Sequence, residues 1–173
     1  MIIQIAGTLF VMTGSVGLGM YFSAKESFRV QDLLEFKKAL MILSSEIDYM
    51  RSTLSEACAN ISKRTGLGIS LVFERFSKLL AKGNGETAYQ LWVEAMEFCK
   101  EETCLAADDR AVLEDFGKTL GYLDKQMQKN AIDCAVAYID EKTKALAVTS
   151  EKNKRMYHSL GVIGGLLLIV VLW

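Results

Sequence analysis

The side chains able to do chemistry are few in this chain. Its single histidine, His158, lies beside Tyr157 at the edge of an uncharged carboxyl-terminal segment. A Ser/His/Asp triad or a Cys/His pair needs the imidazole in a cleft, beside the group that it activates. Because the uncharged segment that begins here is long enough to be a membrane helix, we expect His158 to lie among lipid headgroups instead. The sequence therefore gives no reason to predict nucleophilic catalysis.

The cysteines do not form a metal or redox motif. They are Cys58, Cys99, Cys104 and Cys134, and they include no Cys-x-x-Cys pair. Cys99 and Cys104 are five positions apart, so they share a helix face poorly. Isolated cysteines of this kind usually behave as small core residues. We predict neither a zinc site nor a redox function for them.

Pairs of neighbouring acids are the other candidates for chemistry. Examples are Glu101-Glu102, Asp108-Asp109 and Glu114-Asp115. Neighbours on a helix point about 100° apart, so the two carboxylates of a pair do not converge on one proton or metal ion. A solvated acidic face is the better interpretation. We accordingly predict a protein that is not an enzyme and that binds no cofactor, and its net charge of −1 does not indicate nucleic-acid binding.

The two ends of the chain are free of charge. The first charged residue is Lys25 and the last is Arg155. Segments 1–24 and 156–173 are thus predicted to be transmembrane helices, since about 20 apolar residues span a bilayer. A cleaved signal peptide is disfavoured because segment 1–24 has no basic start and a poor cleavage site. Cations flank both inner ends, which predicts a cytoplasmic middle and both termini on the other side of the membrane.

The middle segment, 25–155, is predicted to be an all-α antiparallel bundle of about five helices. It has no proline, and strong helix formers are frequent in it. Residues 27–64 carry a heptad pattern that predicts one long helix, able to run directly out of the first span. The apolar positions of this pattern are Leu33, Phe36, Leu40, Leu43, Ile47, Met50, Leu54, Ala57 and Ile61.

Shorter helices are predicted to follow. Their ranges are 69–82, 86–101 and 108–121, and a last long helix starts near Asp124 as N-cap and reaches 155. Gly83-Asn84-Gly85 predicts a turn. Five alternating helices would leave the bundle at the end opposite their entry, yet both spans must meet one membrane. We therefore expect one element to break the alternation.

Two further features indicate contacts with other proteins. Gly161 and Gly165, and likewise Ser15 and Gly19, have the four-residue spacing of small residues that lets membrane helices approach. In addition, segment 86–115 holds nine acids and two cations, whereas 63–82 holds five cations and one acid. Such patches could steer a partner, or they could face each other across a hairpin and partly cancel. The sequence leaves both alternatives open.

Three stretches resemble motifs of the stage III sporulation protein AB family. They contain Ser45, Glu46, Ile47 and Tyr49; then Phe116, Gly117, Leu120, Gly121 and Asp124, with Gln128 following; and finally Met156 and Tyr157 within a run from Lys152 to Val162. The resemblance extends over essentially the whole chain. It departs from the family pattern at Ser45, where a threonine is expected, and at Val30, where a proline is usual.

The resemblance implies a role in an endospore-forming bacterium. That family is part of a secretion-like complex of eight proteins that joins mother cell and forespore, and it is similar to the inner-membrane platform proteins of type II secretion and type IV pilus systems. The implied partners are a cytoplasmic secretion-type ATPase and other membrane components, with the bundle in the mother cell, at the outer forespore membrane. A membrane signalling or sensor module is the alternative function, although such modules usually carry a sizeable domain outside the cytoplasm.

Overall fold

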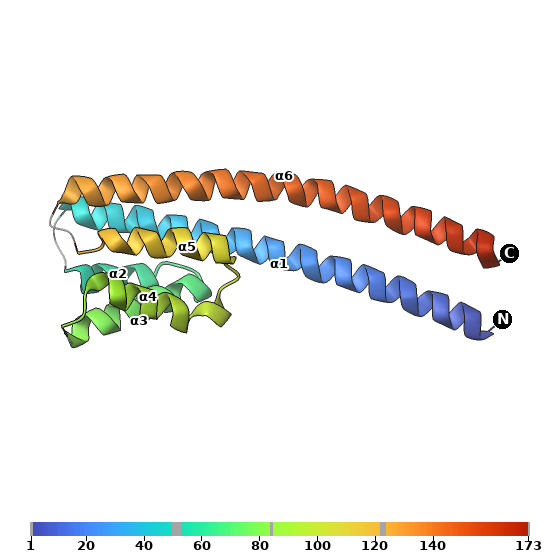
Figure 1. The fold of residues 1–173 in the computed structure, drawn as a ribbon, viewed down its shortest axis with the longest axis horizontal. Coiled ribbons are helices and arrows are strands. Elements are labelled where there is room, and N and C mark those ends of the chain that lie inside the picture. Colours follow the sequence, from blue (N-terminus) through green and yellow to red (C-terminus); the bar gives the residue numbers. More distant parts are fainter. Residues whose placement is uncertain (1, 50–52, 84, 122–123, 173) are drawn as a thin grey trace. The chain divides into compact units, whose positions relative to one another are not determined.

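The regular elements are all helices in the part of the chain that the structure, a computed structural model, describes: residues 2–49, 53–83, 85–121 and 124–172 (Figure 1). They are α1 (Ile2–Tyr49), α2 (Leu54–Ser62), α3 (Leu67–Lys82), α4 (Ala88–Phe98), η1 (Lys100–Glu102), α5 (Ala107–Phe116), η2 (Gly117–Thr119) and α6 (Lys125–Leu172). The chain forms two compact units, residues 29–143 and the two terminal stretches 1–28 with 144–173. The all-α bundle predicted from the sequence is confirmed.

One long helix over 27–64 was a wrong prediction. Helix α1 ends at Tyr49, and α2 starts anew after Thr53. Thr53 Oγ1 accepts from the amide of Glu56 at 3.3 Å, and the Glu56 carboxylate accepts from the amide of Thr53 at 2.9 Å. This reciprocal capping box satisfies backbone donors that a continuing helix would have used itself. The Thr-x-x-Glu spacing was the signal of a new helix, and the uninterrupted heptad pattern concealed it.

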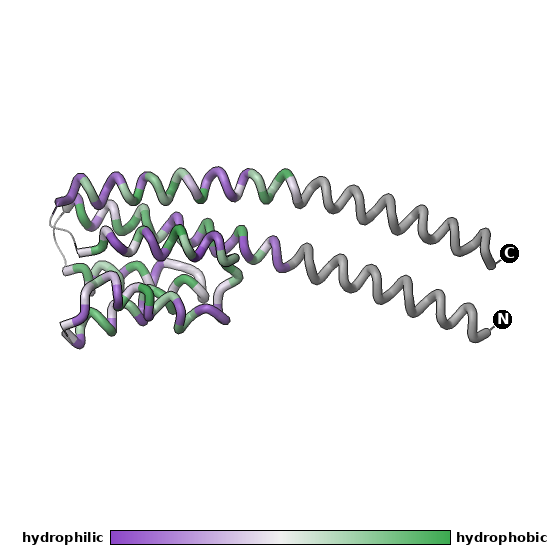
Figure 2. The backbone as a smooth tube through the Cα atoms, in the orientation of Figure 1, coloured by the Kyte–Doolittle hydropathy of each residue, from purple (hydrophilic) through white to green (hydrophobic). Residues whose placement is uncertain are grey.

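The heptad positions were nevertheless correct as a prediction of the core. Six of them are buried, namely Leu33, Phe36, Leu40, Leu43, Ala57 and Ile61. Ile47 and Leu54 are half-buried, and Met50 lies outside the described residues. Helices α1 and α2 both turn their apolar faces toward the same interior, so the pattern continues although the helix does not. Figure 2 shows hydrophobic and hydrophilic residues alternating along the helices of unit 29–143, as expected for helices with one apolar face.

An aromatic cluster around Trp92 forms the centre of unit 29–143. The indole of Trp92 on α4 lies 5.1 to 6.1 Å, centroid to centroid, from four phenylalanine rings on three other helices, mostly edge to face. These rings belong to Phe36 of α1, Phe73 and Phe76 of α3, and Phe116 of α5. Edge-to-face pairs add about 0.5–1.5 kcal/mol each beyond the burial of their area. The indole N–H donates to the carbonyl of Leu113 at 2.9 Å, so the buried ring has no unsatisfied polar atom.

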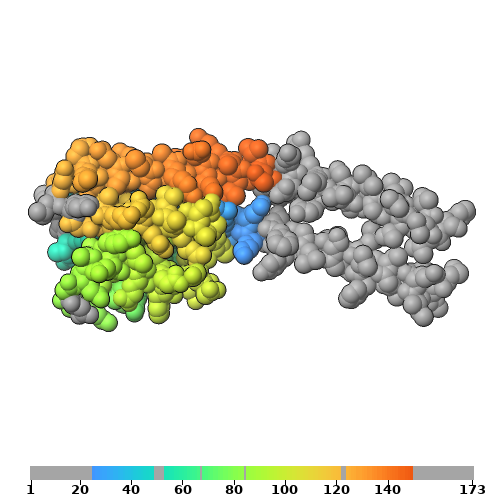
Figure 3. Space-filling model, viewed as in Figure 1, coloured from blue at the N-terminus to red at the C-terminus, as the bar shows by residue number. Residues whose placement is uncertain are grey.

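Helices α1 and α6 run antiparallel within unit 29–143. Lys37 binds Asp140 at 2.6 Å, and Asp48 binds Lys129 at 2.9 Å. Later residues of α1 thus meet earlier residues of α6, and the unit begins and ends on the same side. The additional helix α2 removes the difficulty that five alternating helices presented. On the face shown in Figure 3, α5 and α6 cover most of α1 within this unit.

The backbone of both terminal stretches is helical. Helix α1 begins at Ile2, and α6 ends at Leu172, so each of the two long helices contributes residues to both units. The side chains of the two predicted spans, 1–24 and 156–173, lie outside the described residues. Within the described part of the chain, none of the helices is both long enough and apolar enough to cross a membrane.

A substitution at Gly117 tests the aromatic cluster, because a Cβ at this position would lie 2.0 Å from Cδ1 of Trp92. The ring is enclosed by phenylalanines and cannot move away. We expect Gly117→Ala to lower the free energy of unfolding by about 3 kcal/mol, as overpacked cores do. Urea unfolding of the intact chain, followed by circular dichroism, measures this loss.

Gly85→Ala is the matched control. Gly85 has a positive φ of 80°, but nothing lies within 4 Å of an added Cβ. This substitution should cost about 1 kcal/mol, the strain of an L-residue in a left-handed conformation. Equal losses in the two variants would show that contact with Trp92 is not what excludes a side chain at position 117.

Candidate functional site

A buried carboxylate, Asp109, accepts four hydrogen bonds from other described residues of the bundle. Its side chain is fully buried, whereas the side chain of its neighbour Asp108 is 55% exposed. The prediction of a solvated acidic face is therefore wrong for Asp109. The side chains of Asp108 and Asp109 point in different directions, as expected of adjacent helical residues, and that of Asp109 points into the interior of the protein.

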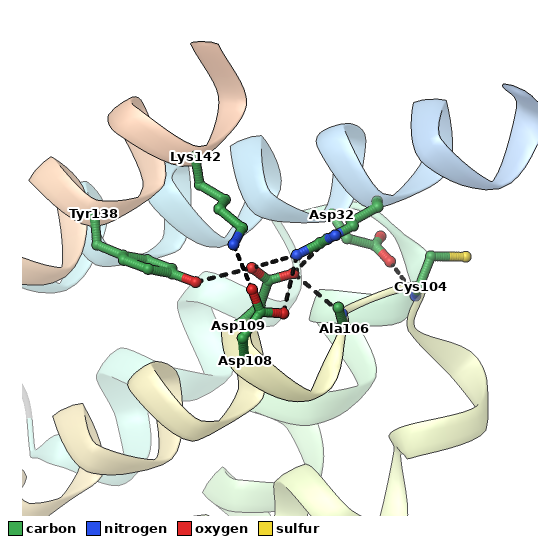
Figure 4. Close-up of polar contacts among 8 residues, drawn as sticks. Asp32, Cys104, Ala106, Asp108, Asp109, Tyr138 and Lys142 are labelled. Carbon is green, nitrogen blue, oxygen red and sulfur yellow. Dashed lines mark hydrogen bonds and ion pairs between the residues drawn. The ribbon is translucent and has the colours of Figure 1, made fainter. Parts of the chain in front are cut away.

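Four donors from three segments surround Asp109 (Figure 4). Arg29 of α1 donates from Nε to Oδ2 at 2.6 Å and from Nη2 to Oδ1 at 3.0 Å, a two-point pair. The hydroxyl of Tyr138 on α6 donates to Oδ1 at 3.1 Å, and the amide of Ala106 donates to Oδ2, also at 3.1 Å. Both carboxylate oxygens are fully used. Paired in this way, a buried charge avoids most of the penalty of leaving water.

Asp108 extends the cluster toward solvent. Its Oδ1 accepts from Nη2 of Arg29 at 3.1 Å, and its Oδ2 accepts from the ammonium group of Lys142. The Lys142 hydrogen bond, with Arg29 nearby, lowers the pKa of Asp108, and Asp108 in turn raises the pKa of Lys142. The hydrogen bond from Arg29 to Asp109 raises the pKa of the guanidinium, and burial raises the pKa of Tyr138. Each of these shifts keeps its group in the charge state that the cluster needs.

Local sequence explains why Asp109 occupies this place. It is the third residue of α5, where the first amides of a helix lack backbone partners and favour an acceptor. Just before α5, Asp32 of α1 accepts from the amide of Cys104 at 2.6 Å and fastens the incoming loop. Burial raises the pKa of Asp32 despite this hydrogen bond. Two carboxylates thus fix the start of α5 against α1.

The cluster holds helices together and has no group free to react. Every oxygen of Asp109 is occupied, and its partners are an arginine, a phenol and a backbone amide. Among the residues that the structure describes, no three His, Cys, Asp or Glu side chains are grouped as a metal ion would require. The cluster joins α1, α5 and α6 where α1 enters the bundle.

The cysteines divide into two kinds. Cys58 and Cys99 are buried, as predicted, and burial raises the pKa of Cys58 to about 12 and also raises that of Cys99. Cys104 is only half-buried and Cys134 is exposed, so the prediction of a core role is wrong for these two. The buried thiols stay protonated near neutral pH and are poor nucleophiles and ligands.

The first family-like stretch lies at the end of α1. Ser45 is exposed, and together with the half-buried Glu46 it lines a groove on this helix. Ile47 is half-buried, and the side chain of Tyr49 lies outside the described residues. The structure therefore does not bring this stretch together with the Asp109 cluster.

The second family-like stretch packs against α4. Phe116, Gly117 and Leu120 are buried, and Gly117 provides the space that Trp92 occupies. Gly121 has a positive φ of 92°, and a Cβ there would lie 3.2 Å from that of Ala88. These positions pack against the aromatic cluster around Trp92, so their placement indicates a structural function.

The stretch then continues into α6. Oδ1 of Asp124 accepts from the amide of Gln126 at 2.9 Å, which confirms the predicted helix start, and Gln128 is half-buried. The remaining predicted positions have side chains outside the described residues. They are Met156 and Tyr157 of the third stretch and the small residues Ser15, Gly19, Gly161 and Gly165.

The segregated charges cancel only in part. Arg75 of α3 binds Glu94 of α4 at 2.9 Å across the hairpin, and Lys78 binds Glu74 within α3. Six exposed charges of the two patches have no ion pair with another residue in the described ranges. They are Lys63, Arg64, Lys82, Glu86, Glu101 and Glu102. Some charges therefore cancel across the hairpin, as one alternative predicted, while others stay exposed and could steer a partner, as the other alternative predicted.

The fold and the cluster define a helical-bundle protein in which the polar groups around Asp109 join three helices. Comparison with known proteins identifies its family. The model of the family described as stage III sporulation protein AB matches residues 4–173, and the chain belongs to this family.

Two individual relatives agree with this assignment. The chain is 28% identical over 170 residues to stage III sporulation protein AB of Bacillus subtilis (strain 168), covering 98% of this chain and 99% of that protein. A solved structure of a stage III sporulation protein AB has a TM-score of 0.67 at 26% identity, covering 72% of this chain and 97% of its own. The family resemblance drawn from the sequence is confirmed.

Asp109→Asn tests the buried cluster. The amide replaces one acceptor oxygen by a donor that faces Arg29 or Tyr138, and the part-buried guanidinium keeps only the exposed Asp108 as counter-charge. We expect the free energy of unfolding of the intact chain to fall by about 3 kcal/mol or more, as when one partner of a buried pair is removed. Asp108→Asn, at the exposed neighbour, should cost under about 1 kcal/mol. Similar losses in the two variants would contradict a special role for Asp109.

Asp108 should also make stability depend on pH. Its pKa is lowered in the folded protein, so its contribution is present above the unfolded pKa of about 3.9 and disappears as pH falls through the folded value. Asp108→Asn cannot lose that contribution. The melting temperature of the variant should therefore fall less than that of the wild type between about pH 6 and about pH 3. Parallel melting curves over that range would argue against the Asp108–Lys142 contact.

Proposed function

We propose that this chain is a non-catalytic, membrane-anchored platform component of a sporulation-specific secretion-like complex that links mother cell and forespore. One observation carries the proposal: the first and last helices of the bundle, α1 and α6, also contribute residues to the two terminal stretches. All charged side chains of the chain fall between Lys25 and Arg155. A bundle with uncharged extensions at both ends is suited to a membrane-bound scaffold.

Membrane insertion would place both termini on the side opposite the bundle. Lys25 and Arg29 flank the first uncharged segment, and Lys152, Lys154 and Arg155 flank the second. Cations near the ends of spans favour the cytoplasmic side. In this proposal the bundle faces the mother-cell cytoplasm at the outer forespore membrane. Gly161 and Gly165, with Ser15 and Gly19 in the first segment, would let the spans pack closely against neighbouring membrane helices.

The proposed cytoplasmic partner is the secretion-type ATPase of the same complex. Support comes from the exposed charges that the bundle leaves without ion pairs among the described residues, basic at Lys63 and Lys82 and acidic at Glu86 and Glu102. Charges of this kind speed and orient association more than they stabilise a fold. Since the described polar groups have no reacting role, the work of such a complex would come from the ATPase.

Co-purification tests this function. The intact chain, extracted in detergent and tagged, should retain the ATPase at low salt and lose it as salt is raised, since the Debye length falls to about 10 Å at 0.1 M. Two charge-reversed variants locate the contact: Lys63→Glu with Lys82→Glu, and Glu86→Lys with Glu102→Lys. One of the two should abolish retention. Failure of the wild-type chain to retain the ATPase at any salt concentration would overturn the proposed contact.

A further inference from the structure

The outer face of α1 contains an open groove with apolar and basic lining. It has a volume of about 410 Å³ and is lined by Leu34, Lys37, Lys38, Met41, Ser45 and Arg64, with Ile42 and Glu46 completing it. Leu34 and Met41 are 49% and 59% exposed, two turns apart on the same side of the helix. Large apolar side chains this exposed, side by side and rimmed by charges, are typical of an interaction surface. We call this feature the α1 groove.

Two of the cations in the α1 groove are available to a partner. Lys37 is already held by Asp140 at 2.6 Å. Lys38 reaches Glu35 only at 3.4 Å and is 52% exposed, and that carboxylate already accepts from the amide of Gly66 at 2.8 Å. Arg64 is exposed and has no ion pair with any residue that the structure describes. The groove therefore favours an occupant that presents both an apolar side chain and carboxylates.

The same chain carries a surface of that chemistry at the end of α4. Phe98 is 68% exposed, and the guanidinium of Arg75, which also binds Glu94, lies 4.5 Å from the centroid of its ring. Glu94, Glu97 and Glu101 flank it in sequence and are all exposed. Lys100 binds Glu97 at 2.9 Å, and Glu101 has no ion pair with a described residue. We call these residues, Phe98 with Glu94, Glu97 and Glu101, the Phe98 surface.

We propose that the α1 groove of one copy receives the Phe98 surface of a second copy. Both surfaces are exposed in the same molecule, so they do not cover each other within one chain. Phe98 would enter between Leu34 and Met41. Glu101 would approach Arg64, and Glu97 would exchange its present partner Lys100 for Lys38. Burial of the three apolar side chains would supply affinity, and the charges would fix the orientation.

This contact joins two different surfaces, so it is head to tail. A symmetric contact through two α1 grooves would gather the Lys38 and Arg64 cations of both copies in one interface without the carboxylates of the Phe98 surface, and like charges would repel. A head-to-tail contact leaves one free groove and one free Phe98 surface at the ends of every chain of copies, so it propagates into a ring or a row. The self-association is independent of the ATPase contact proposed above.

Heterotypic crosslinking of the full chain tests this inference. Two differently tagged copies are co-expressed in a Cys104→Ala and Cys134→Ala background, purified together in detergent and treated with a short bis-maleimide. One carries Ser45→Cys at the edge of the groove and the other Glu102→Cys beside Glu101, so the apolar side chains of the contact are kept. Cys58 and Cys99 are buried and should react little. The expected product is a covalent dimer that carries both tags. Circular dichroism melting confirms that each variant is folded.

Matched controls separate this contact from random collision. Each cysteine variant alone should give no dimer, and Met127→Cys, 52% exposed on α6, should not replace Ser45→Cys. Arg64→Glu in the groove copy should lower the dimer yield by about threefold or more, and Glu101→Arg in the other copy should restore it. Dimer from either variant alone, equal dimer with Met127→Cys, or no dimer in folded protein would overturn the inference. Purified protein is used, so a different partner cannot account for the product.

Discussion

The bundle depends on one constraint, the burial of the Trp92 indole. That ring contacts phenylalanines from three other helices, and its N–H requires the Leu113 carbonyl. In this packing the ring lies 2.0 Å from where a Cβ of residue 117 would be, so the absence of a side chain at Gly117 leaves it room. The turn from α5 into η2 lies where it does because the indole occupies the space that a Cβ would need.

The polar cluster around Asp109 complements this apolar centre. Hydrophobic packing is nondirectional and tolerates small slips of one helix along another. A carboxylate held by Arg29, Tyr138 and a backbone amide has a single geometry that satisfies all its partners. Trp92 thus accounts for much of the cohesion of the bundle, while Asp109 sets the registration of α1 and α6 on α5. Buried ion pairs add little net stability, so the main contribution of Asp109 is to fix how α1 and α6 are aligned on α5.

Local signals in the sequence were sufficient for part of the fold. The turn around Gly83 and the cap at Asp124 depend on residues next to each other, and both were predicted. The break between α1 and α2 also had a local signal at Thr53, but the core pattern was read in preference to it. The Asp109 cluster had none: Arg29 is 80 positions away, and only the folded chain brings the two together. A single sequence contains no trace of that pairing beyond an aspartate near a helix start.

The contact between Trp92 and Gly117 also bears on how such sequences can diverge. Because the indole fills the space beside the glycine, neither position is free to change alone. A relative with a smaller side chain at position 92 would open room for alanine or serine at 117, whereas one that keeps the tryptophan would have to keep the glycine. The two positions should therefore drift as a pair across distant homologues. Paired substitutions at these two positions would show where the core has been repacked during divergence.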